Sequence, residues 1–160
     1  MFFGDIVAEK MQLSSIGKIT KKFWLAIPAH FSFIKLDQFI IMPNHLHGII
    51  EINNQESTTI VGTGHCPVPT QCPVPTDKKQ HYSTFGNVLP KSISTIIGSF
   101  KSVATRTINL KLPKTNFGWQ TRFYDRIIRN EDELSRIREY IIDNPKKWEN
   151  DQDNISSLRC

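Results

Sequence analysis

Two histidines, His45 and His47, stand one residue apart in the otherwise apolar run FIIMPNHLHGII at residues 39–50. Successive side chains of a strand point to opposite faces, so both imidazoles would lie on one face while Leu46 points to the other. Two neighbouring nitrogen ligands form half of a metal site. The spacing therefore predicts a site for a divalent cation. The alternative is a pair of hydrogen-bonded polar residues without a metal, and one short motif leaves it open.

A tyrosine and an asparagine later in the chain could complete such a site. Asn130 is followed by three acidic residues, the pattern of a helix N-terminus, and the helix should run to about Asp143 because Pro145 disfavours helix at Asn144. Tyr140 would flank the apolar stripe of this helix, and Asn144 lies one turn further on the same face. The pair could supply a nucleophile and a third metal ligand, since attack on a phosphodiester becomes feasible when a cation neutralises its charge. The alternative is an aromatic residue at the edge of a helix core.

Positive charge is concentrated between residues 91 and 129. This stretch has eight basic residues and one acidic residue, Asp125, and the whole chain has a formal net charge of +5. Aromatic residues alternate with the cations, a mixture that suits phosphates and unstacked bases. The alternative is a solvated basic face over an aromatic core. The candidate DNA-binding residues are Lys91, Lys101, Arg106, Arg122, Arg126 and Arg129.

The hydrophobic periodicity predicts the elements that must position these groups. Pro43 and Asn44 fit the two central positions of a tight turn, which would place the histidines at the mouth of a hairpin. The expected elements are a strand hairpin over 2–13, a helix over 16–27 capped by Ser14 or Ser15 and ended by Pro28, strands over 31–42 and 45–52, a helix over 92–112 closed by Pro113, and a strand over 117–129.

Residues 53–84 interrupt this pattern with a tandem copy, HCPVPT followed by QCPVPT. A duplicated proline-rich hexamer cannot pack a core or form a ladder, so the segment is predicted to be a flexible surface insertion. His65, Cys66 and Cys72 have the wrong spacing for the usual zinc knuckles, and the duplication accounts for both cysteines.

Length and composition predict one soluble domain over residues 1–160. The chain is 39% hydrophobic, which is enough to fill a core. It has no apolar stretch of about 20 residues and no signal-peptide pattern, so we expect a cytoplasmic protein that does not bind membranes. Three cysteines in a loop and at the last residue do not indicate a disulfide framework.

Four ordered segments resemble the signature segments of the REP-associated tyrosine transposases, relatives of the single-tyrosine HUH transposases of insertion sequences. The resemblance covers nearly the whole chain apart from the repeat. It implies an α+β fold with a ferredoxin-like antiparallel sheet backed by helices. The segments are IIMPNHLHGII at 40–50, STIIGSFKS at 94–102, WQTRFYDRIIRNEDEL at 119–134 and RIREYIIDNPKKW at 136–148.

The resemblance also implies a chemistry. His45 and His47 match the histidines that bind Mg²⁺ or Mn²⁺ in that family, and Asn144 falls where many relatives have a glutamine ligand. Tyr140 matches the nucleophile that attacks single-stranded DNA beside a palindromic hairpin. Its attack leaves a 5′-phosphotyrosine link and a free 3′-OH, and the product is nicked and rejoined DNA.

The family's sheet opens with a long central strand ahead of the segment FFGDIV, and this strand is expected to be missing here. An alternative function is therefore a truncated, inactive remnant that binds hairpin DNA without cutting it. A second alternative is a histidine-triad nucleotide hydrolase, but that chemistry needs a further histidine in the same alternation, and position 49 is Ile49.

Overall fold

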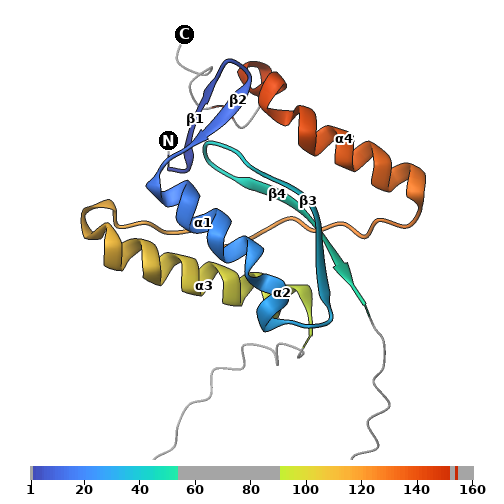
Figure 1. Cartoon of the computed structure of the whole chain (residues 1–160), viewed down its shortest axis with the longest axis horizontal. Coiled ribbons are helices and arrows are strands. Elements are labelled where there is room, and N and C mark those ends of the chain that lie inside the picture. The colour runs from blue at the N-terminus through green and yellow to red at the C-terminus, as the bar shows by residue number, and fades with distance from the viewer. Residues whose placement is uncertain (1, 54–90, 152–153, 155–160) are drawn as a thin grey trace, which may run out of the picture.

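The computed structural model describes residues 2–53, 91–151 and 154, which form the predicted α+β fold (Figure 1). The elements are β1 (Gly4–Val7), β2 (Lys10–Leu13), α1 (Ser15–Leu25), α2 (Ile27–His30), β3 (Ile34–Ile41), β4 (Leu46–Ile52), α3 (Ile93–Lys111), α4 (Glu131–Lys147) and two 3-10 turns, Pro113–Thr115 and Trp148–Asn150.

The β3–β4 hairpin forms the middle layer of the molecule. Helices α1 and α3 cover one of its faces and α4 crosses the other (Figure 1). On the α1 and α3 side, the ring of Trp24 packs 5.3 Å from that of Phe100 and 6.1 Å from that of Phe39. The described strands pair in two separate antiparallel sheets, β1–β2 and β3–β4, whereas a ferredoxin-like fold has a single sheet. A hydrogen bond from Phe3 N to Pro43 O, 3.0 Å long, joins the first hairpin to the turn of the second.

Local sequence signals account for the start of α1 and for the tight turn. Ser14 is the N-cap of α1, and its hydroxyl accepts a hydrogen bond from Gly17 N at 3.1 Å, as predicted. Pro43 and Asn44 lie between Met42 and His45, whose backbone groups bond at 2.8 Å. The predicted hairpin turn is confirmed, and His45 stands directly before β4.

The helix boundary predicted at Pro28 is displaced by two residues. Helix α1 ends at Leu25, and Pro28 lies in the first turn of the short helix α2. A proline has no N–H to donate, and the first turn of a helix is where that donor is not needed. Pro28 therefore belongs to a new helix rather than ending the old one.

The strand predicted over 117–129 is wrong, because no part of this segment is in a strand. It runs instead along α3, whose side chains bond to its backbone. The amide of Asn109 donates to Phe117 O at 3.0 Å and accepts from Phe117 N at 2.8 Å. Lys101 Nζ donates to Gln120 O at 2.9 Å and to Arg122 O at 3.3 Å. The β-favouring residues are present, but their neighbour is a helix instead of a strand.

The predicted end of α4 near Asp143 is also wrong, since the helix continues through Pro145 to Lys147. Proline in a helix removes one backbone hydrogen bond and costs about 3 kcal/mol in an exposed interior position. Here Pro145 is in the last turn and is itself buried, together with Asn144 and Trp148, while Lys146 and Lys147 are exposed. Burial of this turn against the hairpin outweighs the unfavourable local propensity.

The predicted insertion at 53–84, with its cysteines, lies outside the described residues except for Asn53. The N–H of Asn53 donates to Phe33 O at 2.8 Å, next to the first strand of the hairpin. Within the described part of the chain, no helix is long and apolar enough to cross a membrane.

Two glycines provide a matched test of the middle layer. A Cβ on Gly48 would lie 2.4 Å from the ring of Trp24, which is 2% exposed and cannot move aside. We expect Gly48→Ala to lower the free energy of unfolding by about 1–3 kcal/mol through overpacking. Gly98, inside α3, has open space around its Cβ. Gly98→Ala should therefore raise the free energy of unfolding by about 0.5–1 kcal/mol. Urea denaturation checks both values, and equal effects of the two variants would contradict the packing described here.

Candidate functional site

The imidazoles of His45 and His47 lie on the same side of the hairpin, as predicted, and face one another. Their Nε2 atoms are 2.8 Å apart, and the rings meet edge to face with centroids 4.6 Å apart. Both side chains are half-buried at the turn end of the hairpin. Two nitrogen atoms at this distance share a proton or a cation, because two lone pairs alone would repel each other.

Asn44 sets the orientation of the first imidazole. Its Oδ1 lies 2.7 Å from His45 Nδ1. An amide oxygen only accepts hydrogen bonds, so Nδ1 is the donor, and in a neutral His45 ring the lone pair is then on Nε2, the atom that faces His47. Metal-binding histidines are commonly held in this way by their second nitrogen. The sequence predicted Asn44 only as a turn residue; its position directly before a candidate ligand was the available signal for this second role.

Helix α4 and the 3-10 turn that follows it bring two aromatic residues to the histidine pair. The ring of Tyr140 meets that of His47 edge to face at 5.5 Å, and the ring of Trp148 lies 6.0 Å from that of His45. Tyr140 is 49% exposed, so about half of this residue is open to solvent, whereas Trp148 is buried. The predicted pairing of Tyr140 with the histidines is therefore present in the fold. Trp148 was not predicted, because a tryptophan after an apparent helix end has no distinguishing pattern.

Asn144 is buried between these two aromatic residues. It lies four residues after Tyr140 on the same face of α4 and four residues before Trp148, the C-cap of this helix. It is 2% exposed, and neither Oδ1 nor Nδ2 has a hydrogen-bond partner among the residues that the structure describes. A buried amide without partners costs about 1–3 kcal/mol. Such a cost is common at functional sites, where a ligand supplies the missing partner.

The residues present fit a divalent cation. Ligand nitrogens at about 2.1 Å from a metal and at right angles to each other are about 3 Å apart, close to the observed 2.8 Å between the Nε2 atoms. The amide oxygen of Asn144 is an oxygen ligand of the kind that Mg²⁺ and Mn²⁺ accept, and water or phosphate can fill the remaining positions. Among the described residues, no group of three or more His, Cys, Asp or Glu side chains could hold a metal ion, so a cation at the two imidazoles would depend on the Asn144 amide and on water or phosphate for its other ligands.

The predicted DNA-binding residues divide into two kinds. Lys101 Nζ bonds to two backbone carbonyls and lies 5.7 Å from the Phe123 ring centroid, and burial lowers the pKa of its ammonium group. This lysine holds the segment after α3 in place. Arg106 and Arg122 are exposed, and Lys91 lies with Nζ 5.8 Å from the Phe33 ring centroid.

Arg126 and Arg129 lie at the start of α4 and line one open pocket together with Ile127 and Glu133. Arg126 pairs with Glu133 at 2.5 Å, but the arginine side chain remains 80% exposed. Arg129 is also exposed. Both guanidinium groups are therefore accessible to a phosphate backbone.

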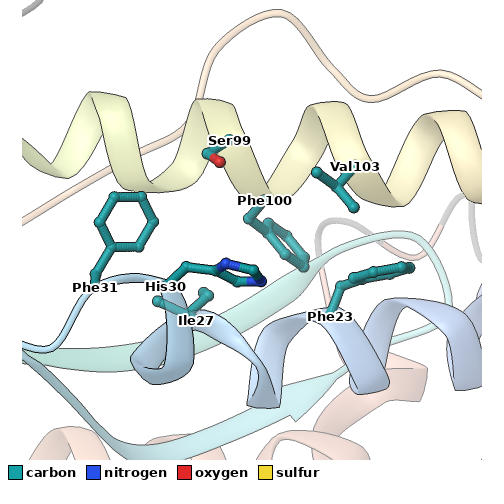
Figure 2. A pocket seen from close by; sticks show the side chains of 7 residues that line it. All are labelled: Phe23, Ile27, His30, Phe31, Ser99, Phe100 and Val103. Carbon is teal, nitrogen blue, oxygen red and sulfur yellow. The ribbon is translucent and has the colours of Figure 1, made fainter.

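A separate apolar cavity lies between α1, α2 and α3 (Figure 2). It is on the α1 and α3 side of the hairpin, opposite to the histidine pair, so it is not part of the candidate site. The lining residues are Phe23, Ile27, His30, Phe31, Ser99, Phe100 and Val103.

The chain is similar to a protein of Haemophilus influenzae (strain ATCC 51907 / DSM 11121 / KW20 / Rd) that is described as an uncharacterized protein. The two are 37% identical over 150 residues, which cover 94% of this chain and 76% of the relative. No protein-family model and no solved structure matches the chain.

The partnerless amide allows a direct stability test. Asn144→Leu replaces it with an apolar group of similar size, so we expect the free energy of unfolding without added metal to rise by about 1–2 kcal/mol. Asn154 is the matched control, because it is buried but its Nδ2 donates to Trp148 O at 3.0 Å. Asn154→Leu should lower the same free energy. Thermal unfolding measures both, and a loss of stability in Asn144→Leu would mean that the amide has partners in the fold.

Proposed function

The chain belongs to one family with the Haemophilus influenzae protein, and from its site we propose that it is a divalent-metal-dependent tyrosine transposase that nicks and rejoins single-stranded DNA at hairpins. The observation that supports this proposal best is the contact between Tyr140 and His47. It brings a solvent-accessible phenol against a histidine pair that fits a cation. The resemblance to the REP-associated tyrosine transposases supports the same assignment.

His45, His47 and Asn144 would hold Mg²⁺ or Mn²⁺. When bound, the cation neutralises the phosphate and polarises the scissile bond. Asn44 keeps the His45 lone pair on Nε2, and the buried Trp148 closes one side of the pair against water. The protein would thus hold the two imidazoles in the orientation that binding of the cation needs.

Tyr140 supplies the nucleophile. Its hydroxyl oxygen forms a bond to the phosphorus, the bond from phosphorus to the 3′ oxygen breaks, and the phenol proton passes to solvent while the leaving 3′ oxygen takes up a proton. The products are a 5′-phosphotyrosine and a free 3′-OH. Attack by a 3′-OH on the phosphotyrosine reverses these bonds and rejoins DNA.

The exposed arginines Arg106, Arg122, Arg126 and Arg129 would contact the phosphate backbone, with Lys91 at the far end of the hairpin. Such contacts make binding sensitive to salt. We assign Lys101 to the fold instead, since its amine is engaged by carbonyl groups.

The histidine pair provides the first functional test. His45→Ala or His47→Ala should reduce Mg²⁺- or Mn²⁺-dependent cleavage of a single-stranded hairpin by more than about 100-fold, because the cation supplies several kcal/mol of charge stabilisation. Hairpin binding should stay within a few-fold, since phosphate contacts dominate affinity. His30→Ala on α2 is the control and should leave cleavage unchanged. If cleavage survives both site substitutions, the metal site is wrong; if the unmodified chain binds but never cleaves, the binding-only alternative holds.

The nucleophile is tested by trapping the covalent adduct. Tyr140→Phe removes only the attacking hydroxyl and should abolish the protein–DNA adduct on a denaturing gel. Tyr124→Phe, in the segment before α4, is the matched control and should form the adduct as the unmodified chain does. An adduct in the Tyr140→Phe variant would show that another group attacks the phosphate.

A further inference from the structure

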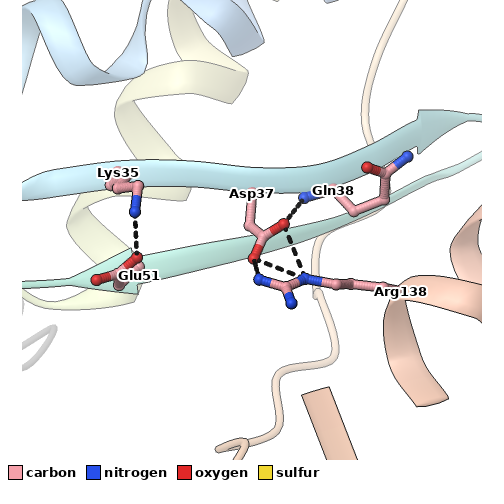
Figure 3. A network of polar contacts seen from close by, with 5 residues as sticks. All are labelled: Lys35, Asp37, Gln38, Glu51 and Arg138. Atoms are coloured by element: carbon pink, nitrogen blue, oxygen red, sulfur yellow. Dashed lines mark hydrogen bonds and ion pairs between the residues drawn. The ribbon is translucent and has the colours of Figure 1, made fainter. Parts of the chain in front are cut away.

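An ion pair between β3 and α4 joins parts of the chain that lie 101 residues apart (Figure 3). Arg138 Nε lies 3.2 Å and 3.1 Å from the two carboxylate oxygens of Asp37, and Arg138 Nη2 lies 2.5 Å from Oδ2. The side chain of Arg138 is 42% exposed and that of Asp37 is 24% exposed. A planar guanidinium bound through two nitrogens fixes orientation as well as distance.

An irregularity in β3 presents the carboxylate to α4. The register between β3 and β4 shifts between Leu36 and Phe39, so Asp37 and Gln38 lie in a bulge. The N–H of Gln38 donates to Asp37 Oδ1 at 2.6 Å and so fixes the carboxylate from the other side. Bulges redirect side chains in this way and are frequent beside functional sites.

The pair is charged throughout the neutral range. The hydrogen bond from Arg138 is the largest influence on Asp37 and lowers the pKa of its carboxyl below 3.8. The other ion pairs in the described part of the chain do not connect α4 to the hairpin: Lys35–Glu51 is within the hairpin, Arg126–Glu133 is at the start of α4, and Lys146–Asp143 is within α4.

We propose that the Asp37–Arg138 pair is a positioning device that fixes the rotation of α4 about its own axis and thereby keeps Tyr140 against His47. At about 100° per residue, Arg138 and Tyr140 are about 200° apart around the helix. The buried Ile141 lies between them, so the two residues flank the apolar stripe on opposite sides. Apolar contacts are non-directional and leave this rotation weakly defined.

Small rotations would matter at the site. A rotation of about 20° moves an atom about 6 Å from the helix axis by about 2 Å. A misplacement of about 1 Å can reduce a rate about 100-fold. The ion pair on one flank therefore controls the geometry of the phenol on the other flank. This inference rests on the proposed function for its kinetic consequence, but not for its structural one.

The structural consequence is tested by nuclear Overhauser effects between the ring protons of Tyr140 and His47 in the full chain without metal or DNA. Asp37→Asn and Arg138→Gln should lose this signal while the far-ultraviolet circular dichroism remains native. Lys35→Gln is the matched control, since it breaks the Lys35–Glu51 pair of the same hairpin without touching α4, and it should keep the signal.

The kinetic consequence is measured with the hairpin substrate and Mn²⁺. In Asp37→Asn the rate of adduct formation at saturating DNA should fall about 100-fold, with KM changed by less than about 3-fold, because the phenol is misplaced while the DNA contacts remain. Arg138→Lys keeps the charge but loses the two-pronged contact, so its rate should be intermediate. If Asp37→Asn does not fold, the rate of adduct formation by Arg138→Lys provides the test instead.

The outcomes separate the two ideas. Retention of the signal in Asp37→Asn and Arg138→Gln, or its equal loss in Lys35→Gln, overturns the positioning role. Loss of the signal in the first two variants alone supports that role even if the unmodified chain forms no adduct, in which case only the proposed function fails.

Discussion

The packing of α4 across the β3–β4 hairpin is the contact on which the candidate site depends. The hairpin supplies two imidazoles, and the helix supplies a phenol, an amide and an indole. Neither element has the site alone. Because the other face of the hairpin is packed against α1 and α3, with Trp24 directly over Gly48, the hairpin cannot shift to follow the helix. The position of the helix is therefore the remaining variable, and polar contacts limit it more sharply than apolar ones.

Two residues at the end of α4, beside the candidate site, lower the stability of the fold. Asn144 is buried without a hydrogen-bond partner in the described part of the chain, and Pro145 interrupts the hydrogen bonds of the last turn of α4. An apolar residue and a good helix former would be more stable at these two positions. A bound cation would supply the partner that Asn144 lacks, and by mass action it would then stabilise the folded chain as well. The cost is thus concentrated where a ligand could offset it.

Helix caps and the tight turn, which act within a few residues, were read correctly from the sequence, whereas the helix ends predicted at Pro28 and Pro145 were not. Ser14 caps α1, Asn130 caps α4 through Glu133 N at 2.8 Å, and Pro43 with Asn44 makes the turn that pairs the histidines. Signals that depend on distant partners were not. The residues of 117–129 favour a strand, but the strand would need a neighbour, and Asn109 and Lys101 bond to its backbone instead. The Asp37–Arg138 pair had no sequence signal, because one aspartate and one arginine far apart in the chain resemble any surface charges.

The hairpin also separates the candidate site from Asn53 and Lys91, the described residues that stand before and after the segment with the duplicated hexamer. Phe33 lies at the open end of the hairpin, where its carbonyl accepts from Asn53 N and its ring lies 5.8 Å from Lys91 Nζ. Asn53 and Lys91, which stand on either side of residues 54–90, therefore both contact Phe33. The histidines are at the opposite end, about 20 Å away for a strand of this length. When the two ends of a segment are held together, each doubling of its length costs only about 0.6 kcal/mol. The described residues on either side of the duplication therefore lie at the end of the hairpin away from the contacts of Tyr140 with His47 and of Trp148 with His45.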